Sequence, residues 1–296
     1  MPAIVETLDL KKSYGAVEAV RGVNLRVPGH SICAFLGQNG AGKSTTLRML
    51  MGMIRPTSGT GHIFGLSIDN EHDSVRIRER TAFVAEDKRL YEYMTAAQII
   101  RFTRAFFPKW RDDLERSLLE RFELPPERKI RKFSKGMRTK LALLLAFARG
   151  SDFLMLDEPT EGLDPVSIEQ VLQIIVSLVA DGATVFFSSH QIAEVEQIAD
   201  HVVMIDHGEI VLDAPMDNVK NEYRQIQAVF SRPVDKRDFQ LAGIERVYSE
   251  GSIVSLIASR NVDAIVEQIR AMQASSVDVA PLSLKEIFLE TVKGRP

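Results

Sequence analysis

A glycine-rich segment at 37–44 is the part of the sequence whose residue types most directly indicate chemistry. It reads Gly37-Gln38-Asn39-Gly40-Ala41-Gly42-Lys43-Ser44 and fits the pattern of Gly, four residues and Gly-Lys-Ser. Glycines let successive backbone N–H groups curve around phosphate oxygens, and the helix expected next directs its positive end at the same anion. Lys43 is placed to reach the β- and γ-phosphates, and the Ser44 hydroxyl can bind Mg²⁺. The segment, called the phosphate loop below, predicts a nucleoside triphosphate site, and a chance glycine-rich turn is the weaker interpretation.

Acidic residues at the end of an apolar run are the second candidate. The run 153–156 ends in Asp157 and Glu158, and an Asp at the end of a parallel strand lies where α/β folds bind ligands. We expect Asp157 to hold Mg²⁺ through water and Glu158 to accept the proton of the attacking water. His190 follows the run 184–189 and is the expected contact of the γ-phosphate. A strand that simply ends in two acids is the alternative, which the phosphate loop upstream makes weaker.

Alternating strand and helix patterns surround these residues. Continuous apolar runs at 31–36, 153–156 and 184–188 are typical of strands buried on both faces. Apolar residues at helical spacing predict helices at 43–53 and 165–180. We also expect strands at 4–10, 17–20, 23–27, 81–85, 202–205 and 209–212, a mostly helical block at 91–148 and a short helix at 192–199. This order argues for an α/β fold, with a mostly parallel sheet that carries helices on both faces.

The pattern changes after Pro215. Strands are expected at 225–230, 244–248 and 253–258, and amphipathic helices at 262–272 and 284–292. We therefore expect two domains, 1–219 and 220–296, with a helical subdomain inserted in the first at about 88–150. The smaller C-terminal domain would be an α+β unit.

Composition excludes several classes of protein. The 296 residues contain 37 Lys and Arg against 40 Asp and Glu, a net charge of −3, which argues against a basic nucleic-acid binder. The single cysteine, Cys33, excludes a disulfide framework and a cysteine-rich zinc site within the chain. No apolar run is long enough to span a membrane, and the first ten residues do not resemble a signal peptide. We expect a protein that stays in the cytoplasm.

One further segment carries a family resemblance. Phe133-Ser134-Lys135-Gly136-Met137, followed by a helix expected at 138–149, resembles the signature of ABC (ATP-binding cassette) transporter ATPases, usually Leu-Ser-Gly-Gly-Gln. Ser134 and Gly136 match the signature, whereas Phe133, Lys135 and Met137 depart from it. The Ser-Lys-Gly-Met form resembles the branch that exports drugs, lipids, sodium or antibiotics. The resemblance covers about 5–214 and implies a P-loop ABC ATPase domain, with a mostly parallel core sheet, an antiparallel N-terminal β subdomain and an inserted helical subdomain.

The resemblance also assigns residues outside the phosphate loop. Tyr14 matches the aromatic that stacks on adenine, and Thr45 continues the phosphate loop. Glu86 stands where the family usually has the Gln of its Q-loop, and Glu161 stands where the D-loop, 160–164, commonly has Ser or Asn. Catalytic roles fall to Lys43, Glu158 and His190, and the metal ligands implied are Ser44, Asp157 and Glu86. The implied nucleotide-binding residues are Tyr14, Gly37, Asn39, Gly40, Ala41, Gly42, Lys43, Ser44, Thr45, Ser134 and Gly136.

The resemblance implies ATP and Mg²⁺ as cofactors and a cycle that needs partners. Two such subunits, in the simplest case a homodimer, would face each other with ATP between them, and hydrolysis would let them separate. A separate membrane permease would dock near 91–107 and hold the protein at the inner face of the cell membrane, without nucleic acid. A soluble ABC-type ATPase acting as a regulatory or assembly clamp is the alternative, and a P-loop kinase or GTPase needs neither the signature nor His190. The C-terminal domain could pair two subunits, bind a regulator or simply pack on the first domain.

Overall fold

The computed structural model describes residues 2–293, which form two compact units. The first unit ends at Asp213 and the second begins at Ala214, before the boundary expected at 219/220. Helix α8, Met216–Glu222, therefore belongs to the second unit. Among the helices of residues 2–293, none combines the length and apolar character that a membrane crossing requires.

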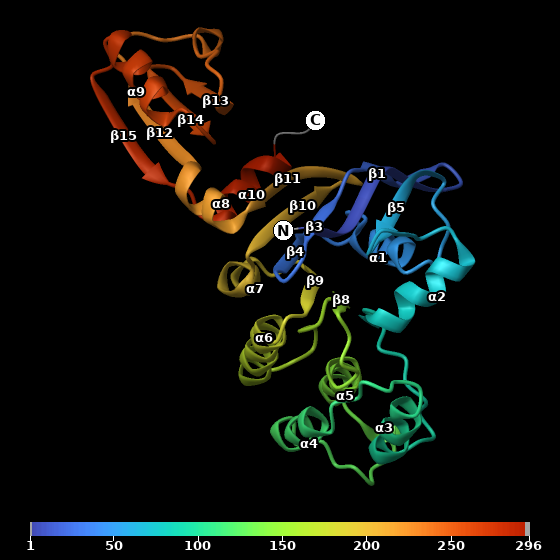
Figure 1. Cartoon of the computed structure of the whole chain (residues 1–296). Coiled ribbons are helices and arrows are strands. Elements are labelled where there is room, and N and C mark those ends of the chain that lie inside the picture. The colour runs from blue at the N-terminus through green and yellow to red at the C-terminus, as the bar shows by residue number, and fades with distance from the viewer. Residues whose placement is uncertain (1, 294–296) are drawn as a thin grey trace. The chain divides into compact units, whose positions relative to one another are not determined.

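A six-stranded sheet forms the centre of the first unit (Figure 1). β4, β7, β8, β9 and β10 are joined in parallel pairs, as expected for an α/β fold. Every residue of β4, β8 and β9 is buried, which confirms the interpretation of their apolar runs. Because parallel strands end at the same edge, the segments that follow these three strands meet there. In sheet order the strands are β11 (Glu209–Pro215), β10 (His201–Asp206), β4 (Ile32–Leu36), β9 (Thr184–Ser189), β8 (Phe153–Asp157) and β7 (Thr81–Val84).

An antiparallel sheet of N-terminal strands forms the second layer of this unit. β1 (Ala3–Tyr14) pairs with β2 (Val17–Val23), β3 (Arg26–Pro28) and β5 (Ser58–Ile63), and β6 (Leu66–Ser67) extends β5. The sequence did not predict β5, which contains two glycines, or β6, which has only two residues. Gly59 of β5 has φ +85°, and a Cβ there would lie 2.1 Å from the main-chain oxygen of Asp9, so close strand approach requires glycine.

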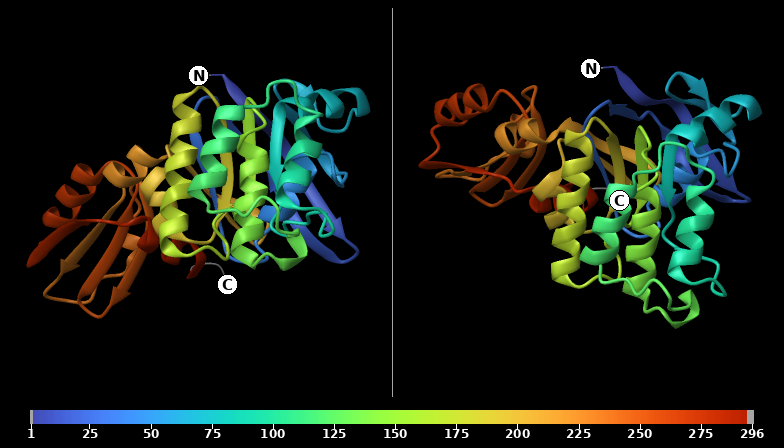
Figure 2. Two further views of the ribbon diagram at one scale, coloured as in Figure 1. Left: turned by 90° about the horizontal axis from the view of Figure 1, so that it is seen from below. Right: turned by 60° about the horizontal axis from the view of Figure 1, so that its bottom comes forward.

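Helices cover the core sheet and form the inserted subdomain. The helix predicted at 165–180 has those bounds in the structure, because Asp164 caps it by accepting a hydrogen bond from Ser167 N and Pro165 begins it. Figure 2 shows α4, α5 and α6 side by side, and Arg121 Nη2 of α4 donates to Gln173 Oε1 of α6 at 2.7 Å. The helices of this unit are α1 (Lys43–Leu50), α2 (Glu71–Arg80), α3 (Ala96–Arg104), α4 (Asp112–Arg121), α5 (Lys135–Phe147), α6 (Pro165–Ala180) and α7 (Ile192–Ile198), with a 3-10 turn, η1 (Ile130–Lys132).

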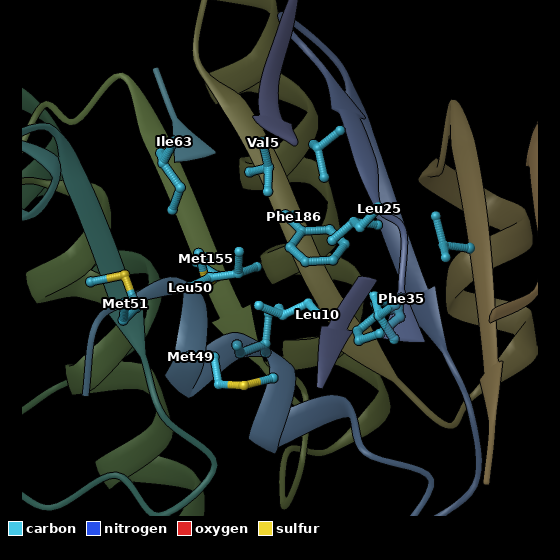
Figure 3. Packing of buried hydrophobic residues seen from close by; sticks show 14 of the residues in the cluster. Val5, Leu10, Leu25, Phe35, Met49, Leu50, Met51, Ile63, Met155 and Phe186 are labelled. Carbon is cyan, nitrogen blue, oxygen red and sulfur yellow. The ribbon is translucent and has the colours of Figure 1, made fainter. Parts of the chain in front are cut away.

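The hydrophobic core joins the two sheets to helix α1. The rings of Phe35 and Phe186 lie 5.4 Å apart within the core sheet, while Met49 and Leu50 approach from α1. Burial of this helix face fixes α1, and with it the phosphate loop, against the strands. Figure 3 shows the members that interlock: Val5, Leu10, Leu25, Phe35, Met49, Leu50, Met51, Ile63, Met155 and Phe186.

The second unit is an α+β unit with its own core. Its antiparallel sheet has the order β13-β14-β12-β15, and Ile265 and Ile269 of α9 are buried in one core cluster with Ile226 and Leu256 of the sheet. The sequence missed β15, whose alternating Ser, Val and Asp are at most half-buried. The elements after α8 are β12 (Arg224–Val229), η2 (Lys236–Asp238), β13 (Ile244–Glu250), β14 (Ile253–Ala258), α9 (Val262–Ala271), β15 (Ser276–Pro281) and α10 (Leu284–Lys293).

Candidate functional site

The phosphate loop joins β4 to α1, as the sequence predicts for a phosphate cradle. Gly40 has φ +83° and Gly42, which caps α1, has φ +111°. A Cβ at Gly37 would lie 2.5 Å from the oxygen of Ile205, and one at Gly42 would lie 2.6 Å from the oxygen of Ala19. Larger residues at these two positions would displace the loop, so the glycines fix a curve of N–H groups before the helix.

Lys43 lies at the bottom of this curve beside a buried carboxylate. Its Nζ donates to the main-chain oxygens of Gly37 at 2.7 Å and Gln38 at 3.3 Å. Nζ also forms an ion pair with Glu158 Oε1 at 3.3 Å, and both side chains are more than nine-tenths buried. Each of these two buried charges is therefore the partner of the other, as buried charges in proteins require.

A cavity of about 270 Å³ collects most of the predicted site residues. It brings Glu86 and Glu158 to the phosphate loop from segments that are distant in sequence. Tyr14, Ser134 and Gly136 do not line it, and Tyr14, half-exposed at the end of β1, lies with its ring 5.2 Å from Lys12 Nζ. Gly37, Ala41 and Asp157 are buried and are not part of the lining, and His190 does not line the cavity either. The lining residues are Ala19, Gln38, Asn39, Gly40, Gly42, Lys43, Ser44, Thr45, Glu86 and Glu158.

Glu158 has an unusual backbone that neighbouring strands hold in place. Its φ is +47°, in the left-handed region, which costs a non-glycine residue about 1–3 kcal/mol. Its N–H donates to Ser188 Oγ at 3.0 Å, and the same hydroxyl donates to Asp157 Oδ1 at 2.6 Å. All three residues are buried. Ser188 thus ties the strained turn after β8 to the end of β9.

His190 lies against the carboxylate of Glu158. Its Nδ1 is 2.9 Å from Glu158 Oε2, and the ring is partly exposed whereas the carboxylate is not. The segment after β9 therefore brings His190 to the same carboxylate that Lys43 contacts from the other side. An imidazole in this place can orient the carboxylate and share a proton with it.

The oxygens expected to bind Mg²⁺ come from three segments. Ser44 Oγ lies 3.5 Å from Glu86 Oε2, and Asp157 Oδ2 is buried without a hydrogen-bond partner. Within residues 2–293, no group of three or more His, Cys, Asp or Glu residues forms a metal site without other ligands. A hydroxyl and carboxylates are the donors that Mg²⁺ prefers, and the unpartnered oxygen of Asp157 fits such an ion.

The signature segment, 133–137, packs against the D-loop, 160–164. Ser134 caps α5 by accepting a hydrogen bond from Met137 N at 3.2 Å. Lys135 Nζ pairs with Glu161 Oε1 at 2.5 Å, and this bond lowers the pKa of Glu161. A Cβ on Gly136 would lie 3.0 Å from the oxygen of Gly162. The signature helix begins at Lys135 rather than at 138, since the Ser134 cap starts it earlier.

Three residues whose side chains contact the site or the D-loop were not predicted from the sequence: Ser188, Lys88 and Glu194. Lys88 Nζ donates to the main-chain oxygen of Glu158 at 2.8 Å. Glu194 accepts a hydrogen bond from Thr160 Oγ1 at 2.8 Å, and burial raises the pKa of Glu194. Ser188 carried a weak signal, since it is a polar residue at the buried end of a strand, whereas nothing local marks the other two.

The chain is similar in sequence and in fold to ATP-binding proteins of ABC transporters. The model of the ABC transporter family matches residues 20–161. The bacitracin transport ATP-binding protein BcrA of Bacillus licheniformis is 32% identical, with 99% of each chain covered. The daunorubicin/doxorubicin resistance ATP-binding protein DrrA of Streptomyces peucetius is 36% identical over 73% of this chain and 67% of its own. A solved ATP-binding subunit of an ABC transporter superposes with a TM-score of 0.67 and 29% identity, over 73% of this chain and 92% of that one.

Proposed function

Since the chain belongs to the ABC transporter family of ATP-binding proteins, we propose how its residues bind and hydrolyse ATP. The phosphate loop binds the β- and γ-phosphates through its N–H groups and Lys43. Glu158 accepts the proton of the attacking water, and His190 orients that carboxylate and contacts the γ-phosphate. The observation that carries this assignment is a buried carboxylate, Glu158, in contact with both Lys43 and His190 at the phosphate cavity.

Ser44, Asp157 and Glu86 are the residues that would hold Mg²⁺. The ion supplies positive charge that neutralises the phosphate oxygens during transfer. Ser44 lies in the first turn of α1 and lines the phosphate cavity, and Asp157 at the end of β8 has a buried oxygen, Oδ2, without a hydrogen-bond partner. Glu86 adds a carboxylate from the segment after β7, within reach of Ser44.

The substitution Glu158→Gln tests the assignment of the base. Gln keeps the size of the side chain and one accepting oxygen but cannot accept the proton, so we expect steady-state hydrolysis to fall by about 10²–10⁴-fold while ATP binding persists. Phosphate release and nucleotide binding are measured on the same preparation, with Glu169→Gln on the exposed face of α6 as the control. Parent-like hydrolysis by Glu158→Gln would show that another group takes the proton.

The site also needs a second subunit. Ser134 and Gly136 lie outside the phosphate cavity, yet the start of α5 offers N–H groups and a positive helix end to an anion. We therefore infer a dimer, in the simplest case of identical chains, in which the signature segment of one subunit covers the ATP of the other. ATP favours the closed pair because its γ-phosphate contacts both subunits, and hydrolysis removes this contact.

Mixing two inactive variants tests the shared site. Ser134→Arg damages the signature segment, and Lys43→Ala damages the phosphate loop. Each alone should be inactive, whereas a mixture contains dimers in which one site has an intact phosphate loop and an intact signature segment. A mixture as inactive as its two components contradicts the sharing of residues between subunits.

A groove beside the helical subdomain is the surface that would receive a separate membrane permease. It has a volume of about 610 Å³ and is lined by residues of β7, the segment after it, α3 and α5. Beside it, Tyr91, Tyr93, Phe102 and Phe106 form a ladder of exposed rings with centroids 5.2–5.9 Å apart. Exposed aromatic clusters of this kind are typical of interaction surfaces. We place the protein at the inner face of the cell membrane through this contact.

Membrane sedimentation tests this placement. The chain should co-sediment with membranes only when its permease is co-expressed, and Phe106→Ser with Tyr93→Ser should abolish the association without changing ATP binding. Membrane-independent ATPase function with no permease requirement would instead favour a soluble regulatory clamp.

Export is the direction we propose, since the relatives are named for bacitracin transport and for drug resistance. We assign the second unit an accessory or dimerisation role.

A further inference from the structure

Lys88 lies between the Q-loop position and the turn that carries Glu158. It follows β7 by four residues and is half-buried. Its ammonium donates to the main-chain oxygen of Glu158 at 2.8 Å, across 70 residues of sequence. Neither the phosphate loop nor the acidic pair accounts for this contact, and Lys88 does not line the phosphate cavity.

Hydrogen bonds hold both main-chain groups of Glu158. The oxygen accepts from Lys88 Nζ and from Glu161 N, the latter at 3.3 Å, and the N–H donates to Ser188 Oγ. The bond from Lys88 is the shorter of the two. It is also the stronger hydrogen bond, because its donor is charged. A left-handed conformation of a non-glycine residue persists only where its surroundings hold it. Loss of Lys88 would leave the oxygen with one long hydrogen bond.

The turn determines where the carboxylate of Glu158 points. Rotation of φ away from +47° moves the Cβ, and with it the contacts of the carboxylate with Lys43 and His190. General-base catalysis requires the base within hydrogen-bond reach of the water. A change of about 1 Å in this position is enough to lower the rate about a hundredfold.

Charge around Lys88 supports the same role. The carboxylates of Glu161, Asp157 and Glu86 face it, and Lys135 is a second cation in the group. Removing the ammonium would leave these acids less compensated next to a site that must accept the negative charge of ATP.

We propose that Lys88 is a positioning residue for ATP hydrolysis, which holds the main-chain oxygen of Glu158 and thereby aims its carboxylate at the attacking water. The proposal rests on the proposed role of Glu158 as the base. It predicts that Lys88 affects the chemical step and leaves the binding of ATP unchanged, because the phosphate cavity is lined by other residues.

Three variants of the full chain test the proposal. Lys88→Met removes the ammonium, Lys88→Arg keeps a charged donor, and Lys109→Met removes an exposed lysine of the same unit that pairs with Asp152. Turnover at saturating Mg-ATP is measured at a protein concentration that gives a clear parent rate. ATP affinity is measured with a fluorescent ATP analogue. Lys88→Met should lower kcat about ten- to a hundredfold with affinity within about twofold, while Lys88→Arg stays within about threefold of the parent and Lys109→Met is unchanged.

Two results would overturn the proposal. One is parent-like kcat for Lys88→Met, and the other is a joint loss of kcat, ATP affinity and thermal stability, as a merely structural lysine would show. If Lys88→Met does not fold, Lys88→Gln is measured in its place and judged by the same criteria. If Glu158→Gln is inactive and Lys88→Met is fully active, only the positioning role of Lys88 is rejected. If Glu158→Gln is fully active, the role of Glu158 as the base is rejected. In the double variant, Lys88→Met should add no further loss to the single-turnover rate of Glu158→Gln, because both act on one group.

Discussion

The hydroxyl of Ser188 offers the most direct test of how the site is built. It accepts the N–H of Glu158 and donates to Asp157 Oδ1, and the three residues are buried where water does not replace a lost partner. Ser188→Ala therefore leaves a buried N–H without an acceptor and a buried carboxylate oxygen without a donor. The first loss destabilises a protein by about 1–3 kcal/mol, and loss of a hydrogen bond to a charged group by about 1.5–3 kcal/mol. Since one hydroxyl makes both bonds, we expect a combined loss of about 2–4 kcal/mol.

Trp110 makes this loss measurable in the first unit alone. It is the single tryptophan, it lies in the first unit, and its Nε1 donates to Glu115 Oε2 at 2.6 Å. Its fluorescence during urea unfolding reports the first unit without a signal from the second. A loss of about 2–4 kcal/mol would lower the Tm of a unit of this size by about 4–16 °C. Ser177→Ala, on the exposed face of α6, is the matched control and should change the unfolding free energy by less than about 0.5 kcal/mol.

The same variant should impair hydrolysis more than nucleotide binding. The turn at Glu158 loses its anchor to β9, whereas the phosphate loop keeps its own glycines and Lys43. ATP affinity within about twofold of the parent, with kcat lower by at least about tenfold, is the expected pattern. An unfolding midpoint and a kcat equal to those of Ser177→Ala would refute the reasoning that this hydroxyl holds the site.

Three further perturbations test other parts of the molecule. Gly37→Ala places a Cβ 2.5 Å from the oxygen of Ile205, so we expect the unfolding free energy followed through Trp110 to fall by about 1–3 kcal/mol and ATP binding to weaken. Burial raises the pKa of Glu194, so the folded state keeps a proton that the unfolded chain has released, and stability falls as pH rises above the unfolded pKa. Glu194→Gln lacks this titration, and its unfolding free energy should fall less than that of the parent between about pH 4 and pH 7. Leu256→Ala opens a cavity in the second unit and should destabilise that unit by about 2–5 kcal/mol, seen by circular dichroism, without moving the Trp110 transition.

Local patterns made part of this structure predictable. The α6 helix could be bounded from sequence because its cap, its first-turn proline and its apolar spacing agree. Helix α2 was missed, since its residues are mostly charged and it buries only Ser74 and Ile77, so no apolar stripe marks it. Its signal was the cap, Asn70, whose side chain accepts from the N–H groups of the first turn.

The candidate site divides in the same way. The residues of the phosphate loop follow one another in the sequence, and so do the two residues of the acidic pair. Residue type and spacing within each segment therefore predict its chemistry. Ser188 reaches Asp157 because the two residues lie opposite each other where β9 pairs with β8. Lys88 reaches the main-chain oxygen of Glu158 from a loop that is distant in sequence. Register and loop crossings depend on tertiary packing, which periodicity along one chain does not encode.

The charged residues that depart from the common family pattern lie close to residues of opposite charge. Glu161 and Lys135 stand at two such positions, and the structure pairs them at 2.5 Å across the D-loop and the signature segment. This pair therefore compensates both charges at a surface expected to meet a partner subunit and ATP. Glu86, the third departure, lies in the group of carboxylates that faces Lys88. The extra acids and the two lysines therefore balance one another, and because Lys88 also holds the turn of Glu158, changing one member of the set should alter the hydrolytic site through the others.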